Sequence, residues 1–203
     1  MKYHKYLGPI LIIFLLGCLI SLGWIGSLDV RSGWVSYNRP VEFPEFSTES
    51  ELALVFFGYT QCKSSCPVTL ALLENVYRKY HTHKQKMIQA LNVVTIDLSG
   101  DPKIDNYVQQ FHPDFIGLSV EPKKLKKLLY SFNVTMRKSN NMQKSADNNQ
   151  VVEQGVSIDH SGAVYLIIKV KGRWVLKRRY IDNPIKPQII FNDLQSIGRS
   201  KSI

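Results

Sequence analysis

Two cysteines separated by three residues are the clearest chemical feature of this 203-residue chain: Cys62 and Cys66, in the segment FGYTQCKSSCP. Thiols at this spacing can pair as a disulfide, and they can also take one metal ion between them. Thiolates are soft donors that suit Cu(I) or Zn(II). A structural zinc site needs four protein ligands, and the third cysteine, Cys18, lies far away in the apolar N-terminus. The pair therefore predicts either a dithiol redox centre or a copper site with another ligand from elsewhere.

The residues around the pair favour thiolate chemistry. Pro67 directly follows Cys66, and proline is favoured at the first position of a helix, which would make Cys66 the N-cap residue. The partial positive charge at a helix N-terminus lowers thiol pKa values, and Lys63 adds a neighbouring cation. We therefore expect both thiols to lie near the start of a helix and to ionise readily.

A further ligand would come from the five histidines, among which His160 is the best candidate. It lies in the segment IDHSG directly before a predicted β-hairpin, so we expect it in a loop at a strand end, where Asp159 could orient its ring. The other histidines have plainer interpretations: a place in the N-terminal head for His4, a solvated helix end for His81 and His83, and a loop for His112. Most isolated histidines are not ligands, so both interpretations of His160 stay open at this point.

The elements around these residues predict one α/β domain over residues 51–203. The run 52–57 is continuously apolar, as in a strand buried on both faces, and Gly58 ends it. Ligand sites of α/β sheets lie at the carboxyl ends of strands, which is where the cysteine pair follows. Further along we expect, in order, a helix from Pro67, a strand at 91–97, a helix from Pro102, a short strand at 117–120, a helix from Glu121 and Pro122, a loop at 137–150, a hairpin of strands 163–170 and 174–180, and a last helix from Pro184 or Pro187. This order is typical of a thioredoxin-like sheet.

The N-terminus predicts a single membrane anchor. Residues 7–28 carry no charge, and a helix of that length spans about 33 Å, against a hydrocarbon core of about 30 Å. We divide the chain into a short cytoplasmic head (1–6), a transmembrane anchor (7–28), a linker (29–50) and a thioredoxin-like domain (51–203). Two alternatives stay open: a cleaved signal peptide, whose apolar region is normally shorter, and lipidation at Cys18, because LLGC resembles a lipoprotein box.

Four motifs occur in a fixed order along the chain. They are FGYTQCKSSCP at 57–67, DPKID at 101–105, FHPDFIGL at 111–118, and DHS at 159–161 followed by YLI at 165–167. With these motifs the chain resembles, over about residues 52–200, the Sco/SenC family. The members of that family are membrane-anchored, thioredoxin-like copper proteins of respiratory oxidase assembly.

The resemblance implies that Cys62, Cys66 and His160 bind one copper ion, as Cu(I), with Cu(II) left open. It also implies a metallochaperone whose partner is cytochrome c oxidase subunit II or another copper protein. Such a protein delivers copper to the CuA site, or keeps the cysteines of that site reduced. One departure concerns the cysteine segment: the family usually has an acidic residue between the cysteines, where this chain has Lys63-Ser64-Ser65. A hairpin that usually precedes the first core strand is also hard to find in 40–52.

Two other functions remain as alternatives. A thiol–disulfide oxidoreductase would use Cys62 and Cys66 as a redox pair without a metal, and it would have no need of His160. An anchored binding domain without a working metal site is the other. The formal net charge of +10 first suggests nucleic acid, but the basic clusters at 123–127 and 169–179 come without base-stacking or groove-reading elements. We therefore expect no nucleic-acid partner, and an anionic membrane surface or an acidic partner face instead.

The predicted orientation follows from the short head before the span and the long domain after it. The N-terminus lacks the Arg- and Ser-rich character of a mitochondrial transit peptide. We therefore expect a single-pass protein of a bacterial inner membrane, with a cytoplasmic N-terminus and the C-terminal domain in the periplasm.

Overall fold

The computed structural model describes residues 17, 34–44, 50–83, 90–144, 151–160, 162–181 and 184–198. The chain divides into two compact units, Met1–Ser32 and Gly33–Ile203. Gly17, which is helical, is the one described residue of the first unit. The predicted head 1–6 with His4, the rest of the predicted span 7–28 and Cys18 thus lie outside the described residues. Within the described part of the chain, no helix has the length and apolar character needed to cross a membrane.

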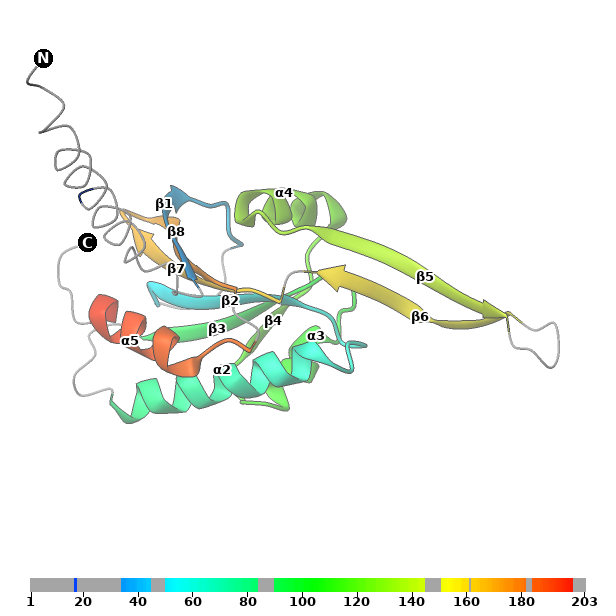
Figure 1. Cartoon of the computed structure of the whole chain (residues 1–203), viewed down its shortest axis with the longest axis horizontal. Helices are drawn as coiled ribbons and strands as arrows, with labels where there is room; N and C mark the ends of the chain where they lie inside the picture. The colour runs from blue at the N-terminus through cyan, green and yellow to red at the C-terminus, as the bar shows by residue number, and fades with distance from the viewer. Residues whose placement is uncertain are drawn as a thin grey trace, which may run out of the picture. The chain divides into compact units, whose positions relative to one another are not determined.

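The second unit is built on a six-stranded mixed sheet (Figure 1). Its strands, in spatial order, are β1 (Trp34–Pro40), β8 (Arg173–Tyr180), β7 (Val164–Val170), β2 (Leu52–Gly58), β3 (Leu91–Asp97) and β4 (Ile116–Leu118). β2, β3 and β4 are parallel, whereas β7 runs antiparallel to β2. The carboxyl ends of the three parallel strands therefore meet at one edge of the sheet, where Gly58 pairs with Asp97.

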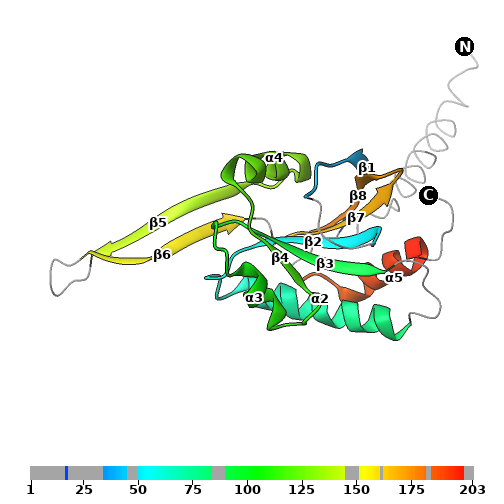
Figure 2. The same ribbon diagram turned by 180° about the vertical axis from the view of Figure 1, so that it is seen from behind.

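Helices cover both faces of this sheet (Figures 1 and 2). α2 (Ser65–Thr82) and α5 (Pro187–Gly198) pack together on one face, α4 (Pro122–Phe132) lies over the other, and the short α3 (Ile104–Gln109) lies beside β4. Because both faces are covered, every residue of β2 is buried, as its continuous apolar run predicts. The Phe132 ring of α4 contacts Phe57 at 5.3 Å and Tyr165 at 5.2 Å between centroids. The predicted α/β class is confirmed.

The predicted elements on either side of the cysteine pair are also confirmed. β2 ends at Gly58, β3 occupies 91–97, and β7 and β8 form a hairpin around Lys171 and Gly172. Lys171 and Gly172 both have positive φ, 50° and 77°. Of the two, only Gly172 adopts this conformation without a steric penalty. The last helix begins at Pro187, the second of its two predicted starts.

The segment 29–50, predicted to be a linker, contains a strand of the sheet. β1 pairs antiparallel with β8 and matches Trp34 with Tyr180 and Pro40 with Val175, so the folded unit begins before residue 51. An edge strand has a partner on one side only, and it tolerates polar residues and proline. The sequence WVSYNRP therefore lacks the apolar pattern of a core strand, and its partner comes from a distant part of the chain.

The prediction of a loop at 137–150 is wrong for 137–144, and residues 145–150 lie outside the described residues. β5 (Met136–Lys144) and β6 (Val151–His160) form a separate two-stranded antiparallel sheet, which extends away from the six-stranded sheet (Figures 1 and 2). The Asn-, Lys- and Ser-rich sequence of β5 offers no apolar face to bury, which is why it predicts a loop. Pairing across the ladder satisfies backbone N–H and C=O groups without such a face.

Candidate functional site

The cysteine loop, residues 59–64, connects β2 to α2 at the carboxyl edge of the sheet. α2 begins one residue before Cys66, with Ser64 at the N-cap position. Cys66 therefore lies within the first turn, and the prediction that it is the N-cap residue is wrong. The reason is that the first N–H groups of a helix have no intrahelical partner. Proline is tolerated throughout this turn, so Pro67 does not fix the first residue of the helix.

The start of α2 is directed at the sulfur of Cys62. The backbone N–H of Cys66 donates to Cys62 Sγ at 3.3 Å, and Ser65 Oγ lies 3.5 Å from the same sulfur. Cys62 is 6% exposed and Cys66 is fully buried, and both side chains are thiols rather than halves of a disulfide. Ser64 makes no side-chain cap hydrogen bond, so Cys62 Sγ takes the place of the oxygen that often caps a helix.

The two thiols have opposite acidities. Burial raises the pKa of Cys62, but hydrogen bonds from the Cys66 side chain, from Ser65 and from the backbone at the helix start outweigh burial and lower this pKa from 9.0 to about 7. Burial, together with the hydrogen bond to Cys62, raises the pKa of Cys66 to about 12. The expectation that both thiols ionise readily is thus right for Cys62 and wrong for Cys66. Hydrogen bonds are the main cause of the low value, whereas Lys63 is exposed.

Hydrogen bonds also tie the cysteine loop to the neighbouring strand. Thr60 Oγ1 donates to Asp101 Oδ2 at 2.5 Å, and the backbone N–H of Asp101 donates in turn to Oδ2 of the buried Asp97 at 2.6 Å. The Thr60 hydrogen bond lowers the pKa of Asp101, whereas burial raises the pKa of Asp97. Asp105 points elsewhere: its carboxylate accepts the Gly117 N–H at 2.8 Å and fastens α3 to β4. Of the two aspartates in the DPKID motif, Asp101 therefore supports the cysteine loop.

Tyr107 is a site residue that sequence patterns did not reveal. Its hydroxyl is buried and has no hydrogen-bond partner among the described residues. Burial and the charges of Cys66 and Cys62 raise the pKa of Tyr107 to about 12. The phenol therefore lies close enough to both sulfurs for their charges to affect its pKa. An unpartnered buried hydroxyl costs stability, and it marks a place that a further polar group or ion could complete. The available signal was the start of α3 at the carboxyl edge of the sheet, where inward residues meet the neighbouring loop.

The backbone brings His160 to the same edge of the sheet. It is the last residue of β6, opposite Met136, and β7 begins four residues later at Val164. Val164 pairs with Phe56, two residues before the end of β2, where the cysteine loop begins. His160 therefore lies at a strand end, as predicted, but as the last residue of β6 rather than in a loop. The described side chains contain no group of three His, Cys, Asp or Glu that could hold a metal ion, and the His160 side chain lies outside them.

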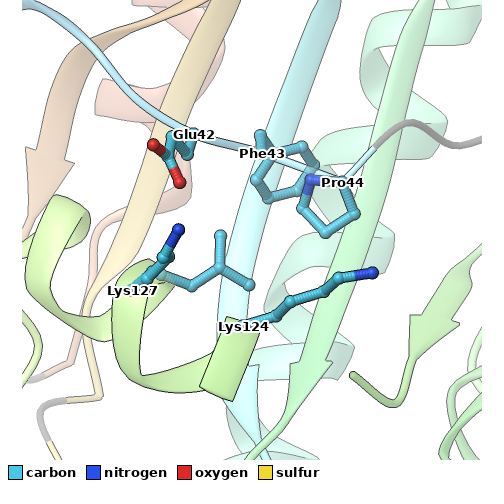
Figure 3. Close-up of a pocket in the computed structure, with 6 residues that line it drawn as sticks. Glu42, Phe43, Pro44, Lys124 and Lys127 are labelled. Atoms are coloured by element: carbon cyan, nitrogen blue, oxygen red, sulfur yellow. The ribbon is translucent and has the colours of Figure 1, made fainter. Parts of the chain in front are cut away.

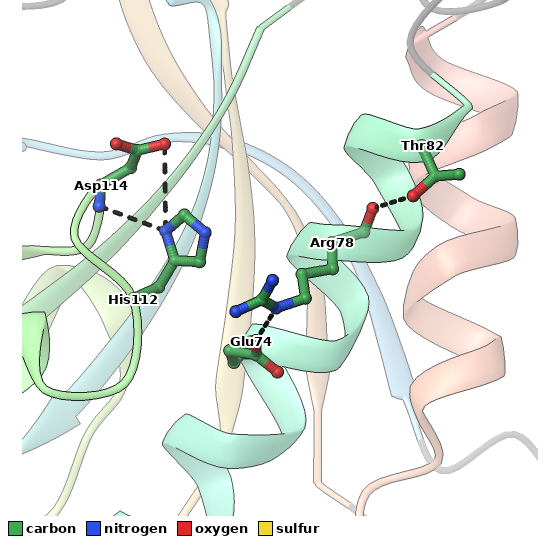
Figure 4. A network of polar contacts seen from close by, with 5 residues as sticks. All are labelled: Glu74, Arg78, Thr82, His112 and Asp114. Atoms are coloured by element: carbon green, nitrogen blue, oxygen red, sulfur yellow. Dashed lines mark hydrogen bonds and ion pairs between the residues drawn. The ribbon is translucent and has the colours of Figure 1, made fainter.

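The other described histidines lie away from the cysteine loop. His81 and His112 both contact the Tyr77 ring, at 4.2 and 4.6 Å between centroids. Figure 4 shows Asp114 beside His112 Nδ1, with the backbone N–H at 3.2 Å and the carboxylate at 3.9 Å. His83 bonds a backbone carbonyl of α2 at 2.8 Å. His81 and His83 are partly buried rather than solvated, and packing near the end of α2 accounts for all three.

A mixed sheet covered by helices on both faces, with one thiol in the loop after a central strand and a second in the first turn of the helix that follows, defines a thioredoxin-like dithiol protein. Comparison with known proteins makes the assignment specific. The SCO1/SenC family profile matches residues 40–197, and the chain belongs to this family. The matched range runs from the end of β1 into α5, and it includes the cysteine loop and His160.

Individual relatives agree with this assignment. An SCO2-like protein of Rickettsia prowazekii is 31% identical over 137 residues, which cover 64% of this chain and 59% of that protein. Apo Sco1 from Thermus thermophilus is 25% identical with a TM-score of 0.56, covering 81% of this chain and 92% of its own. ScoI from Bradyrhizobium japonicum, solved with copper bound, is 25% identical with a TM-score of 0.51, covering 72% and 84%. The chain spans about three fifths of the length of the first curated relatives that it matches.

Proposed function

We propose that this protein is a membrane-anchored, copper-binding assembly factor for cytochrome c oxidase, in which Cys62, Cys66 and His160 hold one copper ion. The observation that carries the proposal is the dithiol at the carboxyl edge of the sheet, to which β6 also brings the backbone of His160. The copper-bound ScoI of Bradyrhizobium japonicum, a member of the same family with a similar fold, supports it.

The donor set suits Cu(I). Two thiolates are soft ligands and imidazole is a common ligand of copper, whereas a structural zinc site would need a fourth protein ligand. Both sulfurs are shielded from bulk water, and the unpartnered Tyr107 hydroxyl lies within electrostatic reach of them. Copper is the cargo here, and thiolates can hold it while passing it to the thiolates of a partner.

The unequal thiols give each cysteine its own part in uptake and release. Cys62, with a pKa of about 7, can bind as a thiolate, whereas Cys66, with a pKa of about 12, must lose its proton to become a ligand. Copper uptake therefore releases a proton, and return of that proton to Cys66 favours release. The Cys66 N–H and the Ser65 hydroxyl hold the Cys62 sulfur at 3.3 and 3.5 Å before copper arrives.

A thiol–disulfide oxidoreductase is the second candidate, and the same asymmetry favours it. A thiol whose pKa lies near ambient pH is the better attacking group, and its partner then resolves the mixed disulfide. In that reaction Cys62 and Cys66 become a disulfide while a disulfide of the partner is reduced to two thiols. Both functions would serve the CuA site of subunit II, one by delivering copper and the other by keeping the cysteines of that site reduced.

We also propose that residues 7–28 anchor the protein in a bacterial inner membrane, with 1–6 in the cytoplasm and the folded unit in the periplasm. The uncharged stretch supports this arrangement. Proteolysis of sealed spheroplasts from outside should remove the folded unit, and protection of that unit would contradict the orientation.

Copper transfer distinguishes the two candidates. The full-length protein, loaded with Cu(I) or metal-free and reduced, is mixed with a soluble CuA domain of subunit II whose cysteines are either reduced or joined as a disulfide. We expect the loaded form to transfer copper to the reduced domain, and Cys62→Ser and Cys66→Ser to abolish loading. If the protein binds no copper but still reduces the disulfide domain, the oxidoreductase is the function.

A further inference from the structure

The solvent face of α4 carries a continuous stripe of three lysines and one tyrosine. Lys123, Lys126, Lys127 and Tyr130 follow one another at helical spacing i, i+3, i+4 and i+7, so they lie on one face. All four are exposed, and Tyr130 is 88% exposed. The opposite face of the helix supplies the buried residues Leu125, Leu128 and Phe132 to the core. We call these four exposed residues the α4 stripe.

The stability of the helix does not explain this stripe. Lys123 and Lys127 are like charges at i and i+4, which repel, and the first turn contains lysines and no acidic residue, against the preference set by the helix dipole. None of the lysines of α4 makes an ion pair with another residue in the described part of the chain. Two acidic residues lie nearby, Glu121 and Glu42, so positive charge stays in excess.

A pocket of about 390 Å³ opens beside the stripe. Its lining comes from the chain after β1 and from α4: Glu42, Phe43, Pro44, Lys124, Lys127 and Leu128 (Figure 3). Phe43 is held in place by ring contacts with Phe132 at 6.0 Å and Trp174 at 5.9 Å. The pocket therefore has a fixed apolar wall and a lining that carries two lysines and one glutamate, a net positive charge that suits an apolar side chain within an acidic segment.

The stripe begins at the edge of the sheet that holds the cysteine loop. β4 is parallel to β3, and β3 to β2, so β4 ends at the same edge as Gly58. α4 then starts four residues after Leu118. A partner that lies along α4 would therefore have part of its surface beside this edge.

We propose that the α4 stripe and the adjoining pocket are the docking surface for the acidic face of a protein that exchanges copper or disulfides with Cys62 and Cys66. The nature of the exchange rests on the proposed function. Carboxylates of the partner pair with the lysines, and one of its apolar side chains enters the pocket beside Phe43. Tyrosine is enriched at the centres of protein interfaces, and an exposed Tyr130 within a basic stripe fits a protein partner better than a lipid surface. The pocket lies next to the C-terminal end of β1. The chain enters this unit at the other end of that strand, before Trp34.

Charge reversal with a matched control tests the surface. The probe is the soluble CuA domain of cytochrome c oxidase subunit II, and its association rate with the full-length protein is measured at low and high salt. Lys123→Glu with Lys127→Glu is compared with Arg173→Glu and Lys186→Glu, which reverse the same number of exposed charges elsewhere. We expect the α4 pair to slow association at low salt by about tenfold and the control pair by less than about twofold. Tyr130→Ala should speed dissociation without changing the salt dependence.

Copper affinity keeps the two proposals apart. All variants should bind Cu(I) as the wild type does, because none of the changed residues lies in the cysteine loop. If the wild type does not bind Cu(I), the proposed function is wrong, regardless of the result for the α4 variants. Three results would each overturn the proposed docking surface. They are equal slowing of association by both charge pairs, no effect of the α4 pair, and a wild type that does not bind the CuA domain at low salt. The surface would also be overturned if the α4 pair weakened binding only to vesicles containing phosphatidylglycerol.

Discussion

Raising the pH should switch on the reactivity of Cys62 with iodoacetamide, with a midpoint near its pKa of about 7. At pH 7 a thiol with that pKa is about 50% thiolate, whereas a thiol at its ordinary value of 9.0 is about 1%. Intrinsic nucleophilicity falls with pKa, by about eightfold over two units at a Brønsted coefficient of about 0.45. Cys62 should therefore react about sixfold faster at pH 7 than an equally accessible thiol of ordinary pKa, and more slowly than that thiol above about pH 8.

The assay is timed alkylation of the metal-free, reduced protein, with each cysteine peptide quantified by mass spectrometry. Cys66→Ala removes the side-chain hydrogen bond to Cys62, so the midpoint should move above 7. Cys62→Ala isolates Cys66, which should resist alkylation at pH 7 because it is fully buried and its pKa is about 12. A midpoint near 9 for Cys62, or equal labelling of the two cysteines, would refute the account of their acidities.

Three substitutions test the contacts around the site. Tyr107→Phe removes a buried hydroxyl that has no partner among the described residues, so chemical denaturation of the metal-free protein should show a gain of about 1 kcal/mol in unfolding free energy; a loss would mean that the hydroxyl is bonded. Gly117→Ala would place a Cβ 2.5 Å from the backbone nitrogen of Asp105, and the same measurement should show a loss of about 2–3 kcal/mol, whereas an unchanged stability would contradict the close packing of α3 on β4. Thr60→Val removes the donor to Asp101, so an NMR titration should show the pKa of Asp101 moving up toward its ordinary value, and no movement would show that this hydrogen bond is unimportant.

The cysteine loop and its flanking elements could be predicted because their signals are local. The apolar run 52–57, Gly58 and Pro67 mark a strand, its end and a helix within a few residues of one another. Only the start of α2 was displaced, since proline fits throughout the first turn of a helix. The reactivity of the pair was half predictable: a helix N-terminus lowers the pKa of a thiol that faces it, but the full burial of Cys66 depends on tertiary packing.

The features that could not be predicted depend on contacts between distant parts of the chain. β1 is a strand because β8 lies beside it, and β5 is a strand because β6 completes its ladder. Neither carries an apolar pattern that would identify it in isolation. Tyr107 likewise becomes a site residue only when α3 packs on β4 and β3, so its helical spacing indicates no more than a core position.

The Cu(I) affinity of the His160→Ala variant tests the central claim most directly. Competitive titration of the reduced protein against a chromogenic Cu(I) chelator compares the wild type, His160→Ala and His112→Ala, the last a control for removing an imidazole that packs against Tyr77 away from the cysteines. If His160 is the third ligand, its loss should weaken Cu(I) binding by at least about tenfold, with the control within about twofold of the wild type. An unchanged affinity for His160→Ala would contradict the three-ligand copper site.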